Sequence, residues 1–91
     1  MSDETLSHVI DTKYEFFAWK RNAINTETDF DEHEALIFRA KDNALVPTLR
    51  FYYDECARLG SKIEHLQEVV RLIERVEQWR EMNPERCKVP D

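Results

Sequence analysis

Apolar residues recur at helical spacing in the first part of the chain, from residue 3 to about residue 25. Two adjoining stripes consist of Leu6, Ile10, Phe17 and Ile24, and of Val9, Phe16, Trp19 and Ala23. At 100° of rotation per residue, these stripes together cover more than half of the circumference of a helix. The pattern predicts an N-terminal helix whose apolar surface is too wide for one partner helix to cover.

The apolar positions between residues 31 and 59 keep a single helical phase, although Pro47 lies among them. One arc of a helical wheel holds Ile37, Phe38, Ala44, Leu45, Leu49, Phe51, Tyr52, Cys56 and Leu59. A proline inside a helix removes a hydrogen bond and clashes with the preceding turn, which kinks or ends the helix. Because the stripe stays in register, the sequence favours one long kinked helix, or two nearly collinear helices split at Pro47, over two helices joined by a loop.

The third apolar pattern is the most regular and runs from residue 62 to about residue 83. Its apolar arc consists of Ile63, Leu66, Val69, Val70, Leu72, Ile73, Val76 and Trp79. Polar residues lie opposite, so the pattern predicts an amphipathic helix. Asn83 and Pro84 end it and leave a mixed-charge tail over residues 84–91.

Gly60 is the only glycine, and it separates the second pattern from the third. A glycine can adopt the left-handed conformation that closes a helix, and Ser61 with Glu64 has the S-x-x-E spacing of a capping box. The two long helices should therefore fold back on each other here. We predict an all-α fold of one domain over residues 1–91: an antiparallel helical hairpin with the N-terminal helix packed alongside, forming an irregular three-helix bundle.

The composition excludes several classes of protein. With 42% hydrophobic residues among 91, the chain is too apolar for a disordered acidic tail. Its net charge of -6 argues against direct nucleic-acid binding, which depends on cations that displace phosphate counterions. Neither a signal peptide nor a membrane span is recognisable. Cys56 and Cys87 lack a metal-binding or redox spacing, which favours a reduced, cytoplasmic setting.

Acidic residues cluster between the first two patterns. The cluster consists of Glu27, Asp29, Asp31, Glu32 and Glu34. Such a cluster can dock on a basic surface and accelerate association by electrostatic steering. Alternatively, these acids stabilise the first turn of a helix, where the helix dipole is positive.

A basic and aromatic segment lies within the predicted first helix. Its candidate ligand-binding residues are Lys13, Tyr14, Phe16, Trp19, Lys20 and Arg21. Aromatic rings and cations together are used by sites for nucleotides and single strands. The alternative is that the lysines lay their aliphatic stems over apolar surface at the edge of a buried helix.

Neither a metal site nor an active site can be assigned. The di-iron pattern Glu-x-x-His fails at both His33 and His65, because Phe30 and Lys62 occupy the positions three residues earlier. Cys56 lies on the apolar arc and is predicted to be a small core residue. No base can be assigned to it, so we expect no enzyme and no cofactor.

The leading prediction for function is a small, acidic, non-enzymatic interaction module. It would be an adaptor or inhibitor that binds a basic protein surface through the acidic cluster, and proteins of phage or bacterial defence, counter-defence or immunity are one class of this kind. The second prediction is a helical homo-oligomer that holds a small anionic ligand, such as a nucleotide, on the basic aromatic segment. The wide apolar arcs predict a homodimer or higher oligomer in either case.

Overall fold

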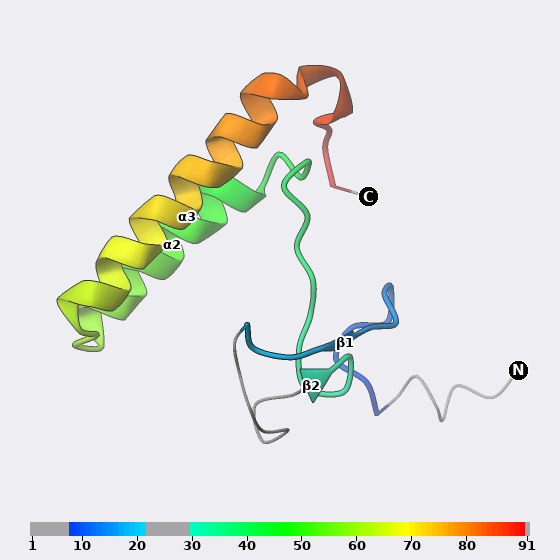
Figure 1. Cartoon of the computed structure of the whole chain (residues 1–91), viewed down its shortest axis with the longest axis horizontal. Coiled ribbons are helices and arrows are strands. Elements are labelled where there is room, and N and C mark those ends of the chain that lie inside the picture. Colours follow the sequence, from blue (N-terminus) through cyan, green and yellow to red (C-terminus); the bar gives the residue numbers. More distant parts are fainter. Residues whose placement is uncertain (1–7, 22–29, 91) are drawn as a thin grey trace, which may run out of the picture. The chain divides into compact units, whose positions relative to one another are not determined.

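The computed structural model describes residues 8–21 and 30–90, in two compact units, Met1–Ile37 and Phe38–Asp91 (Figure 1). The first unit contains the strands β1 (Phe17–Ala18) and β2 (Phe30–Asp31). The second contains the helices α2 (Leu45–Arg58) and α3 (Ile63–Met82) and the short 3₁₀ helix η2 (Pro84–Arg86). The chain is therefore mostly helical, with one antiparallel helix pair and a small two-stranded sheet. That it forms a single domain stays a prediction.

In the first unit, β1 and β2 pair antiparallel, with Phe17 opposite Asp31 and Ala18 opposite Phe30. The segment before β1 is held by the turn after β2, because the backbone N–H groups of Ile10 and Asp11 both donate to the carbonyl oxygen of Glu32, at 2.8 and 3.1 Å. These bonds join residues more than twenty positions apart in the chain.

The side chain of Asp11 organises this unit and is buried. Its Oδ1 accepts the backbone N–H of Lys13 at 2.9 Å and that of Tyr14 at 2.8 Å. Its Oδ2 accepts the backbone N–H of Ile37 at 2.8 Å. One carboxylate therefore satisfies three backbone donors and ties the two ends of the described unit together.

The prediction of an N-terminal helix over residues 3–25 is wrong for residues 8–21, and the rest of that range lies outside the described residues. Over residues 8–21 and 30–90 the structure holds two α-helices in a pair and not a three-helix bundle. The bonds from Asp11 explain the difference, since an aspartate that captures N–H groups two and three residues ahead competes with helical hydrogen bonding. Phe17 then lies in β1, in the extended conformation that aromatic residues favour.

The stability of the first unit should depend on pH through Asp11. The N–H of Tyr14 lowers the pKa of this carboxyl below its usual 3.8, aided by the N–H groups of Ile37 and Lys13 and the charge of Lys13, while burial opposes the shift. Because the folded pKa is the lower one, the carboxylate stabilises the unit above about pH 4, and this contribution is lost as the pH falls through the folded pKa.

Replacement of Asp11 with asparagine should remove this pH dependence and lower stability at neutral pH. An amide has one acceptor oxygen, so either the N–H of Ile37 or the N–H groups of Lys13 and Tyr14 would face an NH₂ group. Protection of the Tyr14 and Ile37 amides against hydrogen exchange measures the effect. Unchanged protection in the variant at neutral pH would contradict the role of Asp11.

In the second unit, α2 and α3 run antiparallel along each other (Figure 1). Five side chains form the buried core between and beside them: Leu45, Cys56, Val69, Ile73 and Val76. The antiparallel helical hairpin predicted from the periodicity is thus confirmed, and α3 lies within the predicted range 62–83.

Gly60 closes α2 as expected. It has φ of 84°, in the left-handed region. Its N–H donates to the carbonyl oxygen of Ala57 at 3.1 Å, and the N–H of Ser61 donates to that of Cys56 at 2.9 Å, which is the Schellman pattern. The predicted capping box is wrong, because α3 begins one residue later, with Lys62 as its N-cap and without a side-chain cap bond.

Pro47 neither kinks nor breaks a helix. Because α2 begins at Leu45, Pro47 lies in the first turn, where a backbone N–H has no helical acceptor in any case. The predicted helix over residues 31–59 is therefore wrong for residues 31–44. There the side chain of Asp42 accepts the N–H of Ala44 at 2.7 Å, and the backbone of Asp42 forms a parallel bridge with Lys88.

Candidate functional site

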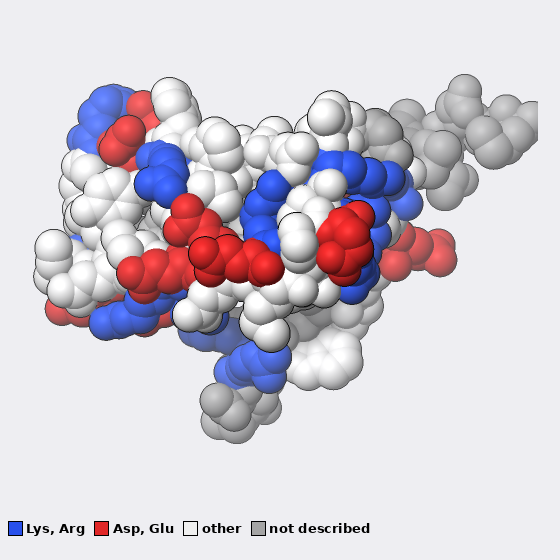
Figure 2. Space-filling view, turned by 90° about the horizontal axis from the view of Figure 1, so that it is seen from above, with Lys and Arg blue, Asp and Glu red and all other residues white. Residues whose placement is uncertain are grey.

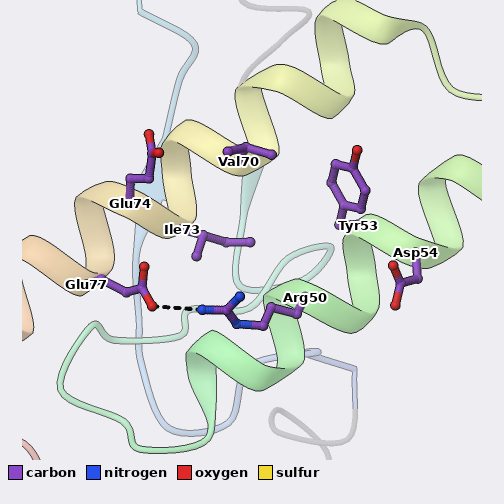
Figure 3. Close-up of a pocket in the computed structure, with 7 residues that line it drawn as sticks. All are labelled: Arg50, Tyr53, Asp54, Val70, Ile73, Glu74 and Glu77. Atoms are coloured by element: carbon purple, nitrogen blue, oxygen red, sulfur yellow. Dashed lines mark hydrogen bonds and ion pairs between the residues drawn. The ribbon is translucent and has the colours of Figure 1, made fainter.

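A groove runs between the exposed edges of α2 and α3 in the second unit (Figure 3). Its volume is about 410 Å³, and its lining residues are Arg50, Tyr53, Asp54, Val70, Ile73, Glu74 and Glu77. The residues from α2 have the spacing i, i+3, i+4, and those from α3 the spacing i, i+3, i+4, i+7. Such spacings place side chains on one face of a helix, so each helix supplies one wall.

The floor of the groove is apolar and its rim is charged. Ile73 is 8% exposed and belongs to the core, while Val70 beside it is 42% exposed. Across the groove, Arg50 Nη2 donates to Glu77 Oε2 at 2.8 Å, joining the two helices (Figure 3). Both side chains are solvated, so this ion pair contributes at most about 1 kcal/mol to stability. Its effect is to hold the side chains of Arg50 and Glu77 in place on the rim of the groove.

Two further carboxylates on the rim have no cationic partner among the described residues. They belong to Asp54 on α2 and Glu74 on α3. Since Arg50 is engaged by Glu77, the groove presents excess negative charge beside the ring of Tyr53. The site combines an apolar floor, an aromatic ring and free carboxylates, which suits the side chain of a lysine or arginine.

The acidic wall continues along α3 into a second, more open hollow of about 820 Å³. It shares Glu74 and Glu77 with the groove and adds Glu81, together with Asn43, Val46, Gln78 and Arg80. The three glutamates follow one another at spacings of three and four residues. They form an acidic row that a ligand longer than one side chain could contact.

Arg80 fixes the loop that precedes α2. Its Nη1 donates to the carbonyl oxygens of Ala40 at 3.0 Å and Asp42 at 3.1 Å, and its Nη2 donates to Asn43 Oδ1 at 2.6 Å. The planar guanidinium suits such a set of acceptors. These bonds hold the loop at the C-terminal end of α3, where Asn43 also lines the second hollow.

A cysteine, a histidine and a tyrosine meet on the other side of the helix pair. His65 Nε2 lies 3.3 Å from the hydroxyl of Tyr52 and 3.7 Å from Cys56 Sγ. The hydrogen bond with Cys56 raises the pKa of Tyr52. Sequence reasoning found no base for Cys56, because His65 is nine positions away across the Gly60 turn. The thiol is nonetheless 6% exposed, as expected for the core residue that the apolar arc predicted.

The predicted acidic cluster lies in the first unit as far as it is described. Asp31 belongs to β2, and Glu32 and Glu34 follow in a turn, while Glu27 and Asp29 lie outside the described residues. Residues 30–44 contain no helix, so the alternative that these acids stabilise a helix start is wrong for Asp31, Glu32 and Glu34. Docking through this cluster stays a prediction.

Asp31, Glu32 and His33 bring three possible metal ligand atoms within 4.8 Å of one another. The carboxylate of Asp31 is already engaged, since its Oδ1 accepts the N–H of His33 at 2.9 Å and lies 3.0 Å from Nδ1 of the same residue. The N–H of His33 lowers the pKa of Asp31. This arrangement is a local turn bond, and we assign no metal to it.

The predicted ligand-binding residues also lie in the first unit, yet they do not share a helical face. Lys13 Nζ lies 5.8 Å from the ring centroid of Tyr14, and Trp19 is 65% exposed beside Phe17, with ring centroids 5.7 Å apart. The N–H of Phe16 points to Glu32 Oε1 at 3.4 Å. Lys20 and Arg21 are exposed after β1. Binding of an anionic ligand by this segment stays a prediction.

Comparison of the chain with protein-family models, with curated proteins and with solved structures finds no match. Neither α2 nor α3, nor any other helix in residues 8–21 and 30–90, has the length and apolar character required to cross a bilayer.

Proposed function

We propose that the protein is a non-enzymatic interaction module, an adaptor or inhibitor, that receives a basic segment of a partner protein in the groove between α2 and α3. The groove carries the proposal, because it places unpaired carboxylates and an aromatic ring around an apolar floor. Each of these elements matches one part of a lysine or arginine side chain.

Each part of a lysine or arginine side chain has a matching part of the groove. Its aliphatic stem would lie over Val70 and Ile73, removing apolar surface from water. Its charged group would reach the carboxylates of Glu74 and Asp54. The ring of Tyr53 adds a cation–π contact, which is worth about 0.5–1 kcal/mol at an exposed site. A neighbouring basic residue of the partner could contact Glu81 further along the acidic row.

The acidic cluster supports the same kind of partner from the first unit. Residues 1–37 contain nine acidic residues and three lysines or arginines, so they account for the whole net charge of -6. A negative field of this kind raises the rate at which a basic protein is encountered. Asp31, Glu32 and Glu34, with Glu27 and Asp29, are the residues that we propose to steer it.

Binding of a fluorescently labelled lysine- and arginine-rich peptide, measured by anisotropy, tests the proposal. We expect affinity in the micromolar range that falls as salt rises, because solvated ion pairs are screened. The double variant Glu74→Gln, Asp54→Asn should weaken binding by about tenfold, which corresponds to about 1.4 kcal/mol for two lost charge contacts.

Glu64→Gln is the matched control. Glu64 is an exposed glutamate of α3 outside the groove, so its loss should change affinity only slightly. Because Glu64→Gln removes one charge and the double variant removes two, a free-energy loss for Glu64→Gln of half that of the double variant or more would show attraction by net charge alone and would contradict recognition in the groove.

A further inference from the structure

The side of the helix pair opposite the groove carries large side chains outside the core. On α2 and its cap, Tyr52 and Leu59 are seven residues apart and are 47% and 71% exposed. On α3, His65, Leu72 and Trp79 are also spaced by seven. The rings of Tyr52 and His65 are nearly perpendicular, and their centroids lie 6.1 Å apart. These five residues, which we name the Tyr52 face, therefore form two adjacent stripes.

We propose that a second copy of this chain docks on the Tyr52 face, so that two helix pairs associate about a two-fold axis. A spacing of seven on both helices is the pattern with which helices pack at small crossing angles in four-helix bundles. The inference does not depend on the groove, which lies on the other side of the pair.

The charges around the Tyr52 face favour a second copy of this chain over a partner whose surface is only acidic or only basic. Glu55 pairs with Arg58 on α2 and Glu68 with Arg71 on α3, in each case three residues apart. Each edge thus carries both signs, and a two-fold copy can set arginine against glutamate. Residues 38–91 contain ten acidic and ten basic residues, and acidic and basic side chains lie interspersed in the view of Figure 2. Residues 38–91 therefore add no net charge repulsion between two copies.

The size of the core also calls for further burial. Five buried side chains hold the helix pair together, and both cysteines are free, so no disulfide supplements them. Natural scaffolds of this size commonly gain stability from oligomerisation. Two helices of about 20 and 30 Å, packed about 10 Å apart, present roughly 500 Å² in projection, which is below the 800 Å² per partner of a standard stable interface and matches a weak, concentration-dependent dimer.

Sedimentation equilibrium of the full chain, from low to high micromolar concentration, tests the inference. The wild type should approach twice the mass of one chain as concentration rises. Leu72→Glu should weaken association by about a hundredfold, since it places a charge in an apolar interface, and the milder Leu72→Ala by about tenfold. Circular dichroism of both variants verifies that the helices persist.

Val70→Glu is the matched control. Val70 is on α3, two residues from Leu72, and the two side chains are similarly exposed, at 42% for Val70 and 38% for Leu72. Val70, however, lines the groove. It should leave the association intact. A single-chain mass at every concentration would overturn the inference, including the case in which residues 1–37 of the same chain cover the face. A dimer that both Leu72 variants leave intact while the helices persist would also overturn it. So would a dimer that Val70→Glu dissociates more than Leu72→Glu does.

Discussion

Replacement of Gly60 with valine should destabilise the helix pair by about 1–3 kcal/mol, the cost of forcing a β-branched residue into left-handed backbone. Gly60 has φ of 84°, and a Cβ built on it would meet no heavy atom within 4 Å. The cost would therefore come from the backbone conformation and not from a clash. It would act on the only turn that reverses the chain between α2 and α3.

Urea unfolding at one fixed protein concentration measures this effect, since association would otherwise shift the apparent stability. Gly60→Asn is the matched control, because asparagine tolerates the left-handed region better than other residues with a side chain. It should keep most of the stability that valine loses. Equal stability of the valine variant and the wild type would show that the turn is not left-handed in solution, and the hairpin would be wrong.

Replacement of Arg80 with alanine should cost about 2–3 kcal/mol, because hydrogen bonds from a charged donor are worth more than neutral ones. The side chain makes three such bonds to the loop before α2. Their loss should release that loop and raise amide exchange at Asn43, whose N–H donates to the carbonyl oxygen of Lys88, and at Lys88, whose N–H donates to that of Lys41. Chemical unfolding and hydrogen exchange measure the two consequences.

Two variants separate the geometry of Arg80 from its charge. Arg80→Lys keeps the charge but cannot reach the same acceptors with a planar fork, so it should recover part of the loss. Arg75→Ala removes an exposed arginine of the same helix and should change stability by less than about 0.5 kcal/mol. A similar cost for Arg75→Ala and Arg80→Ala would contradict the anchoring role.

The regular parts of the fold were predictable because their signals are local. Apolar residues from Ile63 to Val76 follow one helical face, and α3 forms where that face is found. Gly60 could be identified as the end of α2 because glycine is the residue that adopts left-handed backbone without cost. Neither inference required knowledge of a distant part of the chain.

The structure of residues 8–21 and 31–44 could not be predicted from the sequence, because apolar residues at helical spacing do not exclude turns and strands. The apolar phase continues through Pro47, yet residues 38–44 are held outside a helix by Arg80 and by the backbone of Lys88. In the first unit, residues 8–21 form turns and the short strand β1, which contains Phe17, although their apolar residues have helical spacing. A single carboxylate that satisfies three backbone N–H groups outweighs the weak helical preference of that segment.

The sequence by itself determined the helix-turn-helix of the second unit, its amphipathic faces, and the concentration of negative charge in residues 1–37. Only the tertiary structure decided which side chains of the second unit meet. Arg50 and Glu77 are 27 positions apart and Arg80 and Ala40 are 40 apart, whereas Cys56 and His65 are brought into contact by the turn at Gly60. Helix propensity and periodicity act over a few residues, whereas these contacts depend on how two finished helices pack. The groove and the Tyr52 face are both products of that packing.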